Sequence, residues 1–420
     1  MSESSKSVIV LGVEPRITVP VARSLQRLGI SVSVASISPL DAKLHSRSIR
    51  DFVRLPHPDQ AREGFVSALS AHIKARKADM LIPVTDGALS AVSSHYDELS
   101  SLVHVACPPP AITGRVLNKE ATLAVADQCG IRIPHEYAIS KTTGINSLPQ
   151  LAFPVVAKPR QKSSTETFKV RYLRSKSELE QALESGSLED AILQEYCEGE
   201  GVGVEMLIHE GRCIAAFQHR RLAEFPHTGG VAVKAVAEAI DPKLQAAALR
   251  LLLALEWEGV AMVEFRDDRR TGTAALMEVN GRYWGTLSLP IQAGVDFPAY
   301  HWQVVHGEVP SVPAGYAVGL IWRWTAGSLK RWHGVLRSGG TRLSKPATQP
   351  VMTSSNTRDA LWIASDPWPA VLEFLKTGRT LVRSDARALL KRILPKRTVA
   401  ALRGKPLPPP AVQRPEHLGE

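Results

Sequence analysis

The stretch from Gly259 to Arg282 constrains the fold of this 420-residue chain more than any other. Two apolar, β-prone runs flank a polar turn, 267–272, that carries Gly272, and this pattern predicts a β-hairpin. With the hairpin centred near Thr271, Glu264 and Glu278 lie directly opposite each other on one face. Because two opposed carboxylates repel each other, the arrangement favours a cation between them.

The second strand of this hairpin adds further polar groups. Glu278, Asn280 and Arg282 share one face, since side chains alternate along a strand. Two carboxylates and an amide oxygen are hard ligands that suit Mg²⁺. A solvated pair of glutamates is the competing interpretation. The apolar runs around both glutamates, and Tyr283 and Trp284 directly after them, favour the metal site.

The length of the chain predicts two or three domains. No apolar run reaches the roughly 18 residues that a membrane span needs. No basic segment precedes an apolar one of signal-peptide length at the N-terminus, so we expect a cytoplasmic protein. The four cysteines show no C-x-x-C spacing and are predicted to be reduced thiols.

The N-terminal segment alternates a strand (7–11), a helix (19–28) and a strand (31–35), which predicts a parallel sheet. It lacks G-x-G-x-x-G, so no dinucleotide site is predicted. A later strand, 80–84, ends close to Asp86. Because ligands of such sheets bind beyond the carboxyl ends of the strands, Asp86 is a candidate substrate contact. A turn or helix-cap role is the alternative.

Two lysines stand at the ends of predicted elements. Lys119 lies near the start of a helix predicted from 117 to 129, after a proline linker at 108–110. Lys158 ends a strand of buried type, 153–159, where an unpaired charge is costly. A phosphate partner would remove that cost, whereas Lys119 taken alone is normally just a solvated side chain at a helix start.

Together these features resemble the ATP-grasp superfamily, of the carboxylate–amine ligase type. The resemblance covers about residues 7–310 and is carried by Val-Glu-Phe at 263–265, Met-Glu-Val-Asn-Gly-Arg at 277–282 and the run 293–298. It implies an α/β and α+β protein with four parts. These are a Rossmann-like N-terminal domain (1–112), a two-part ATP-grasp domain (113–310), a basic C-terminal extension (311–394) and a disordered tail (395–420).

The resemblance also implies ATP and Mg²⁺, with two ions and with Mn²⁺ as a second candidate. The implied metal ligands are Glu264, Glu278 and Asn280. The implied catalytic residues are Arg282, Arg220 and Asn280. The implied nucleotide contacts are Lys119 and Lys158 at the phosphates, Glu195, Tyr196 and Cys197 at the adenine, and Glu200 at the ribose, with Glu198 in reserve. Weaker substrate candidates are Asp86, Arg221, Thr228, Gly229 and Ser288.

The implied reaction joins a carboxylate to an amine or a thiol through an acyl phosphate, with small molecules as partners. The loop 160–168 departs from the superfamily pattern, because it lacks the usual glycines that let backbone N–H groups approach phosphates. An ATP-binding regulatory or assembly protein with weak chemistry is therefore one alternative. A module that binds anions or a membrane surface is the other, and the oligomeric state is left open.

The net charge of +10 belongs to the C-terminal portion, because residues 311–420 hold 18 Lys and Arg against 6 Asp and Glu. Trp322, Trp324 and Trp332 lie among basic residues, and two helices are predicted at 366–376 and 386–394. A solvated basic face is the commoner explanation of this combination, and a peripheral membrane or another anionic partner is the alternative. Nucleic acid is not the expected partner.

Overall fold

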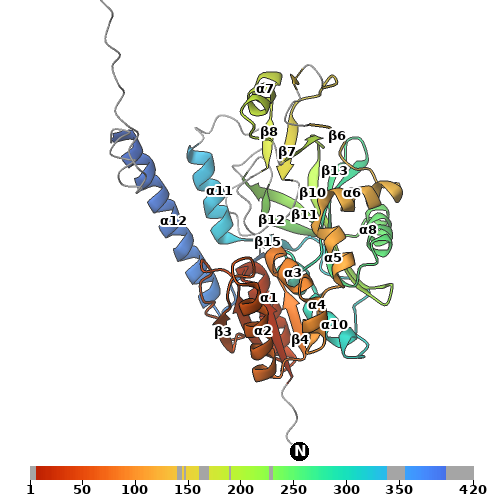
Figure 1. Ribbon diagram of the computed structural model, residues 1–420, viewed down its shortest axis with the longest axis vertical. Coiled ribbons are helices and arrows are strands. Elements are labelled where there is room, and N and C mark those ends of the chain that lie inside the picture. Colours follow the sequence, from red (N-terminus) through yellow and green to blue (C-terminus); the bar gives the residue numbers. More distant parts are fainter. Residues whose placement is uncertain are drawn as a thin grey trace, which may run out of the picture.

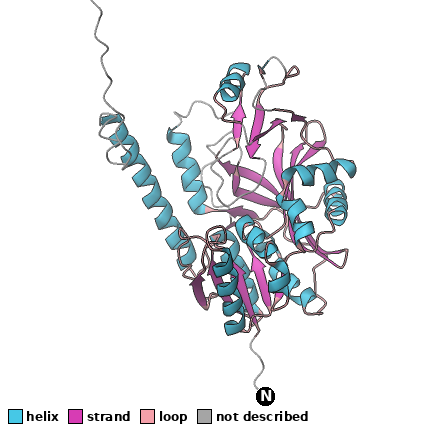
Figure 2. Ribbon diagram, in the orientation of Figure 1, coloured by secondary structure: helices cyan, strands magenta, loops and turns pink. Residues whose placement is uncertain are grey.

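The protein is seen here as a computed structural model that describes residues 6–139, 144–145, 148–159, 170–188, 191–226, 230–337 and 355–393. Three β-sheets and their helices form an α/β and α+β architecture, which confirms the predicted fold class (Figure 1). Figure 2 shows a twisted sheet in the middle, with a smaller sheet beyond each end of it. Within the described ranges, no helix combines the length and apolar character that crossing a membrane requires.

The N-terminal sheet has five parallel strands in the order β3-β2-β1-β4-β5. Its elements are β1 (Ser7–Leu11), α1 (Pro15–Arg27), β2 (Ser31–Ser36), β3 (Asp51–Arg54), α2 (Arg62–Arg76), β4 (Met80–Pro83), α3 (Asp86–Ser93), α4 (Tyr96–Ser100) and β5 (His104–Val105). Val8 and Val10 belong to the core that contains α1, and Ile9 and Leu11 belong to the core that contains α2. Helices therefore cover both faces of this sheet.

Two helices, α5 (Pro110–Leu117) and α6 (Lys119–Gln128), lead out of the N-terminal sheet. Pro110 was expected in a linker, but it is the first residue of α5, where its missing N–H costs nothing. Asn118 caps α6 by accepting hydrogen bonds from the backbone N–H groups of Glu120 and Ala121. Lys119 therefore stands at the start of this helix, as predicted.

A four-stranded antiparallel sheet follows, in the order β6-β9-β7-β8. Its elements are β6 (Glu136–Tyr137), β7 (Val155–Pro159), β8 (Arg171–Leu173), α7 (Lys176–Glu184) and β9 (Ala191–Glu195). Val155, Leu173 and Leu193 pack with Leu179 of α7 on one face. The opposite face, which carries Lys158, is left for the site.

The central sheet has seven strands in the order β14-β13-β10-β11-β12-β15-β16. Its elements are β10 (Glu200–His209), β11 (Arg212–Phe225), β12 (Val231–Glu238), α8 (Pro242–Ala254), β13 (Gly259–Asp268), β14 (Thr273–Asn280), β15 (Ile321–Arg323) and β16 (Thr357–Asp359). One face, called the outer face below, packs against α6 and α8 through Val202, Val204 and Phe265. The other, called the cleft face, carries Glu264 and Glu278.

The C-terminal portion, predicted as an extension, joins the central sheet, because β15 pairs with β12 and β16 pairs with β15. Helices α9 (Ser288–Ala293) and α10 (Phe297–Val305) precede this portion, and its own helices are α11 (Thr325–Arg337) and α12 (Trp368–Ile393). The expectation of two helices at 366–376 and 386–394 is wrong, because α12 continues through Gly378. A helical glycine costs only about 1 kcal/mol relative to alanine. The predicted tail, 395–420, lies outside the described residues.

Candidate functional site

The hairpin of β13 and β14 supplies the acidic centre of the site. Glu264 and Glu278 are paired in register, as predicted, and Gly272 has the positive φ of 65° that favours glycine in the turn. Burial raises the pKa of Glu264, the guanidinium of Arg221 opposes that effect, and the charge of Glu278 adds to it. The two carboxylates are thus close enough to disfavour each other's charge.

Two adjacent arginines of β11 lie on opposite faces of the central sheet. Arg221, on the cleft face, forms an ion pair with Glu264. Arg220 lies on the outer face, with Nε 2.8 Å from Glu238 and Nη2 2.7 Å from Asp267. Strand alternation turns Arg220 away from the acidic pair. The prediction of Arg220 as a catalytic residue therefore does not fit its position, and Arg221 is the arginine beside the acidic pair.

A buried histidine forms the floor beside the acidic pair. Gly203 of β10 pairs with Glu264 on one side and with His219 on the other. A Cβ at Gly203 would lie 2.4 Å from Cε1 of His219, so only glycine leaves room for this ring. Nδ1 of His219 lies 2.5 Å from Oε1 of Glu205, and both side chains are fully buried. The glycine and this pair together hold the floor of the cleft face in place.

Lys158 faces the acidic pair from the four-stranded sheet. Burial lowers its pKa, the carboxylates of Glu278 and Glu264 act in the opposite direction, and the charge of Lys119 lowers it further. These effects place both predicted phosphate lysines and the hairpin around one cleft. An ammonium group beside two carboxylates suits the joint binding of phosphate groups and a metal ion.

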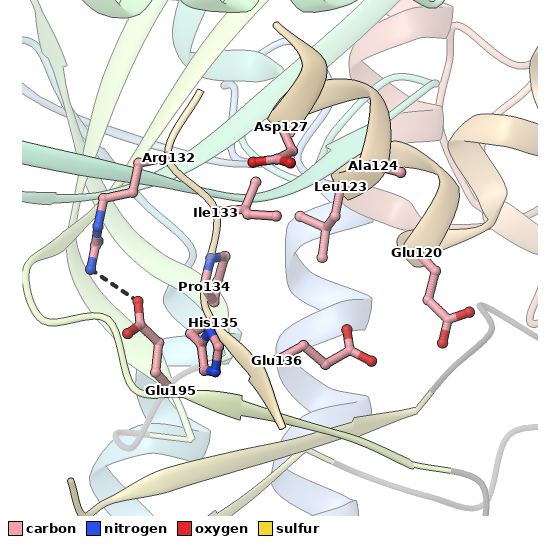
Figure 3. A pocket seen from close by; sticks show the side chains of 10 residues that line it. All are labelled: Glu120, Leu123, Ala124, Asp127, Arg132, Ile133, Pro134, His135, Glu136 and Glu195. Carbon is pink, nitrogen blue, oxygen red and sulfur yellow. Dashed lines mark hydrogen bonds and ion pairs between the residues drawn. The ribbon is translucent and has the colours of Figure 1, made fainter. Parts of the chain in front are cut away.

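Strand pairing decides which residues of β9 face this cleft. Val156, which shares a face of β7 with Lys158, pairs with Gln194. Gln194 is buried, and neither of its amide atoms has a hydrogen-bond partner among the described residues. Glu195 points the other way and accepts a 2.9 Å hydrogen bond from Arg132 at a separate cavity of about 770 Å³ (Figure 3). This corrects the prediction that the Glu195 side chain contacts adenine.

The other predicted nucleotide residues lie just after β9. Tyr196 is exposed, and its ring makes an edge-to-face contact with Tyr172, with the ring centroids 6.0 Å apart. Cys197 is buried, and burial raises the pKa of its thiol to about 11. Glu200 is exposed at the start of β10, and Glu198 forms an ion pair with Arg270. Their contacts with a nucleotide stay predictions.

Arg282 and Asp86 link the hairpin to the N-terminal sheet. Nε and Nη2 of Arg282 donate to the two carboxylate oxygens of Asp86 at 2.9 and 3.1 Å. Nη2 also donates to Oδ1 of Asn280 at 3.2 Å. Burial lowers the pKa of Arg282, but the carboxylates of Asp86, Glu278 and Glu14 together outweigh this effect and the net pKa is raised. The cap of α3 is Thr85, so Asp86 remains available to hold Arg282.

A cavity of about 320 Å³ lies at this junction. It is lined by Glu14, Arg16, Ile17, Val84, Thr85, Asp86, Arg221, Val231, Ala232, Met262, Glu264, Glu278, Asn280, Arg282, Trp284, Gly285 and Thr286. The indole Nε1 of Trp284 and the hydroxyl of Thr286 are buried and have no hydrogen-bond partner in the part of the chain that the structure describes. Arg16 donates to Glu14 at 2.9 Å, and its guanidinium lies over the Trp324 ring at 4.1 Å from the centroid. The cavity therefore offers fixed cations and two unused polar groups to a ligand.

Sequence reasoning missed Gln194, Tyr172, Arg16, Trp284 and Thr286. Register between β7 and β9 could have indicated Gln194, because it has the same parity as the residue opposite Lys158. Arg16 and Tyr172 are brought to the site by elements distant in sequence and have no local signal, whereas Trp284 and Thr286 follow Arg282 closely in the chain.

Some predicted substrate contacts are not found at the cavity. The hydroxyl of Ser288 accepts a 2.8 Å hydrogen bond from the indole of Trp322, and both side chains are buried. Ser288 therefore serves the packing of α9 on β15, which corrects its assignment as a substrate contact. Thr228, Gly229 and the predicted phosphate loop, 160–168, lie outside the described residues.

The donor set of the hairpin fits a magnesium ion. It consists of two carboxylates and one amide, and each carboxylate disfavours the charge of the other. Among the described residues, no cluster of three or more His, Cys, Asp or Glu side chains is arranged to hold a metal. A metal here would thus need phosphate oxygens or water to complete its ligands, which is how proteins usually bind Mg²⁺.

Comparisons with known proteins relate part of this chain to a described family and its fold to solved structures. A family model described as "ATP-grasp in the biosynthetic pathway with Ter operon" matches residues 187–324, which include the hairpin. A search of curated proteins finds no significant match.

Several solved structures have a similar fold. An L-amino acid ligase from Bacillus licheniformis is 18% identical, with a TM-score of 0.55, over 71% of this chain and 73% of that one. The PurK N5-carboxyaminoimidazole ribonucleotide synthetase, as its ADP complex, is 14% identical, with a TM-score of 0.58, over 80% and 85%. A biotin carboxylase from Campylobacter jejuni is 13% identical, with a TM-score of 0.58, over 76% and 75%.

Proposed function

We propose that this protein, a member of the ATP-grasp superfamily, is an ATP-dependent ligase that joins a carboxylate to an amine through an acyl phosphate. The observation that carries the proposal is the meeting of Lys158 with the paired Glu264 and Glu278 at a cleft next to the 320 Å³ cavity. Phosphate-binding cations, metal ligands and a polar acceptor pocket are the three parts that such a reaction needs.

The nucleotide is assigned to the cleft between the four-stranded sheet and the central sheet. Lys158 and Lys119 would contact the phosphates, and the buried amide of Gln194 would face the base. Gln194 offers one donor and one acceptor, which matches the donor and acceptor on the edge of adenine. The crystal structures of PurK and of biotin carboxylase named above hold ADP and an ATP analogue, which supports a nucleotide in this fold.

Glu264, Glu278 and Asn280 are the residues that would hold Mg²⁺. A bound magnesium ion offsets negative charge on the phosphate oxygens during transfer. Arg221 is already paired with Glu264, so it holds one ligand in position and adds a positive charge beside the transferred group. Protein groups fixed before the reaction stabilise such charge without reorganisation.

The acceptor substrates are assigned to the 320 Å³ cavity. A carboxylate oxygen attacks the γ-phosphorus, the bond from this phosphorus to the bridging oxygen breaks, and ADP leaves. The amine then attacks the activated carbonyl carbon and loses a proton, and inorganic phosphate leaves with the bonding electrons. Arg282, held by both oxygens of Asp86, is placed to stabilise the acyl phosphate, and Arg16 to bind a substrate carboxylate.

The test is ADP release with candidate substrate pairs, wild type against Glu278→Gln. Because one similar structure is an L-amino acid ligase, pairs of L-amino acids are the first to screen, followed by other carboxylates and amines. Turnover by the variant should fall at least about 100-fold, equivalent to about 3 kcal/mol of barrier. ATP binding should fall less, because Lys158 and Gln194 remain.

Glu256→Gln is the matched control, because this glutamate is exposed and pairs only with Arg115 in the described structure. A magnesium series should restore part of the turnover of Glu278→Gln and leave the control unchanged. Equal turnover by wild type and Glu278→Gln would remove Glu278 as a metal ligand. Tight ATP binding without ADP release for any substrate pair would instead favour the regulatory alternative.

A further inference from the structure

The exposed apolar side chains of this protein are concentrated on its C-terminal helices. Of the seventeen large hydrophobic residues that are exposed in the described structure, eight lie between residues 332 and 382. They include three tryptophans, Trp332, Trp362 and Trp368. Figure 1 shows α12 at the periphery, beside α11. Large exposed apolar residues gathered in one place mark a binding surface.

On α12 these residues form one stripe. Trp368, Leu372, Leu375 and Val382 follow each other at spacings of four, three and seven residues, which places them on one face of a helix. They are 56%, 37%, 60% and 68% exposed. The other side of α12 packs on α11, where Asp385 pairs with His333 and Arg337 at 2.8 and 2.7 Å. Most of the stripe is therefore turned away from α11, while Leu375 also lines the groove between the two helices.

The charges along the stripe are positive. Arg379 lies within it, and Lys376 and Arg383 lie beside it, all three exposed. The described part of α12 has two acids, and neither forms an ion pair with these cations in the described structure, although Asp41 lies within electrostatic reach of Lys376. Glu373 lines the groove between α11 and α12, and Asp385 is held by α11. The outward surface of the helix is thus apolar and cationic at once.

We propose that α12 binds the surface of an anionic lipid bilayer, lying in the plane of the interface with the stripe Trp368-Leu372-Leu375-Val382 toward the lipid. An apolar helix face with tryptophan at one end and Lys and Arg along its border is the pattern of an interfacial helix. A second copy of this chain fits less well, because a two-fold contact through the stripe would gather the cations of both copies, Arg379 among them, at one interface. Anionic headgroups complement the same charges.

The test is co-sedimentation of the full chain with vesicles of phosphatidylcholine alone or mixed with phosphatidylglycerol. Binding should require phosphatidylglycerol and should weaken as salt is raised. Arg379→Gln with Arg383→Gln should weaken it about tenfold or more by removing charge. Leu372→Gln with Leu375→Gln should do the same by removing apolar surface.

Leu40→Gln with Val309→Gln is the matched control, since these residues are 87% and 94% exposed and lie outside α12. Quenching of tryptophan fluorescence by brominated lipid is a second readout, which reports whether Trp368 lies in the bilayer. Part of the tryptophan fluorescence should be quenched in the wild type, and Trp368→Phe should remove that part. ATP binding and circular dichroism should be unchanged in every variant.

Sedimentation velocity without lipid tests whether a second copy of this chain, and not a lipid surface, covers the stripe. A dimer that dissociates on Leu372→Gln with Leu375→Gln would assign the stripe to a second copy and overturn the proposal. Equal sedimentation with both vesicle types, or none with either, would overturn it as well. Failure here leaves the proposed ligase function untouched, because α12 contributes no residue to the cleft or to the 320 Å³ cavity.

Discussion

The outer face and the cleft face of the central sheet consist of alternate residues of the same strands. The outer face buries apolar side chains, whereas the cleft face carries the charged side chains of the proposed site. On the outer face, Val202, Val204 and Phe265 are buried under α6 and α8. On the cleft face, Glu264, Glu278 and Arg221 hold charges close together under burial. Burial of apolar surface stabilises a fold, whereas burial of charge costs free energy unless a ligand completes it. Neighbouring residues of one strand therefore serve different ends, because one packs in the core and the next faces the proposed site.

The outer face should show the largest effect on stability. Phe265→Ala removes a ring that is 1% exposed and should lower the free energy of unfolding by about 3–5 kcal/mol. Urea denaturation followed by circular dichroism measures this change. Leu253→Ala on α8 is the control, because that side chain is 41% exposed and should change stability by no more than about 0.5 kcal/mol. Equal losses for the two variants would contradict the contrast between the faces.

Arg220 and Arg221 are adjacent in the sequence but lie on opposite faces of the sheet, so replacing each in turn tests the contrast between the faces directly. Arg221→Gln leaves Glu264 beside Glu278 without its cation, and turnover should fall about 100-fold. Arg220→Gln should leave turnover within about threefold and lower stability by about 1–3 kcal/mol, since Glu238 and Asp267 lose a partner. ADP release and urea denaturation on both variants measure the two effects. The opposite pattern would assign the chemistry to the outer face.

On the cleft face, a side chain proposed to bind the nucleotide should lower the free energy of unfolding, although by less than the changes described above. Burial lowers the pKa of Lys158 below its usual value of 10.5. Between the lowered pKa and 10.5 the unfolded chain binds a proton that the folded protein does not, so stability should rise with pH in that window. At neutral pH the folded protein bears the cost of a buried ammonium group.

Lys158→Met should therefore stabilise the nucleotide-free protein by up to about 1 kcal/mol at neutral pH and remove the alkaline rise. The same change should weaken ATP binding. Urea denaturation at pH 7 and pH 10, together with calorimetric titration of ATP, tests both statements. A variant that is less stable and binds ATP normally would show that Lys158 serves the fold and not the nucleotide.

The hairpin could be predicted because its signals are local. Alternating apolar residues, a glycine turn and equal spacing from Thr271 were enough to place Glu264 opposite Glu278, and a bulge falls only after that pair. The start of α6 was predictable for the same reason, since Asn118 caps the helix from directly before it. The parallel N-terminal sheet followed from alternating strand and helix patterns.

The choice between neighbours was not predictable from local pattern. Whether Arg220 or Arg221, and Gln194 or Glu195, faces the cleft depends on the register with other strands and on bulges in β11. β15 and β16 are strands of three residues whose pairing partners are distant in sequence. Continuation of α12 through Gly378 depends on packing against α11, which sequence periodicity does not report.

The contact between Asp86 and Arg282 joins residues 196 positions apart. It means that the first hundred residues and the hairpin cannot be exchanged independently between related proteins. A chimera that takes its N-terminal sheet from a relative lacking an acid at position 86 would leave the guanidinium of Arg282 buried without its carboxylate. Recombination of these proteins, in evolution or in the laboratory, must therefore carry both residues together or replace both at once.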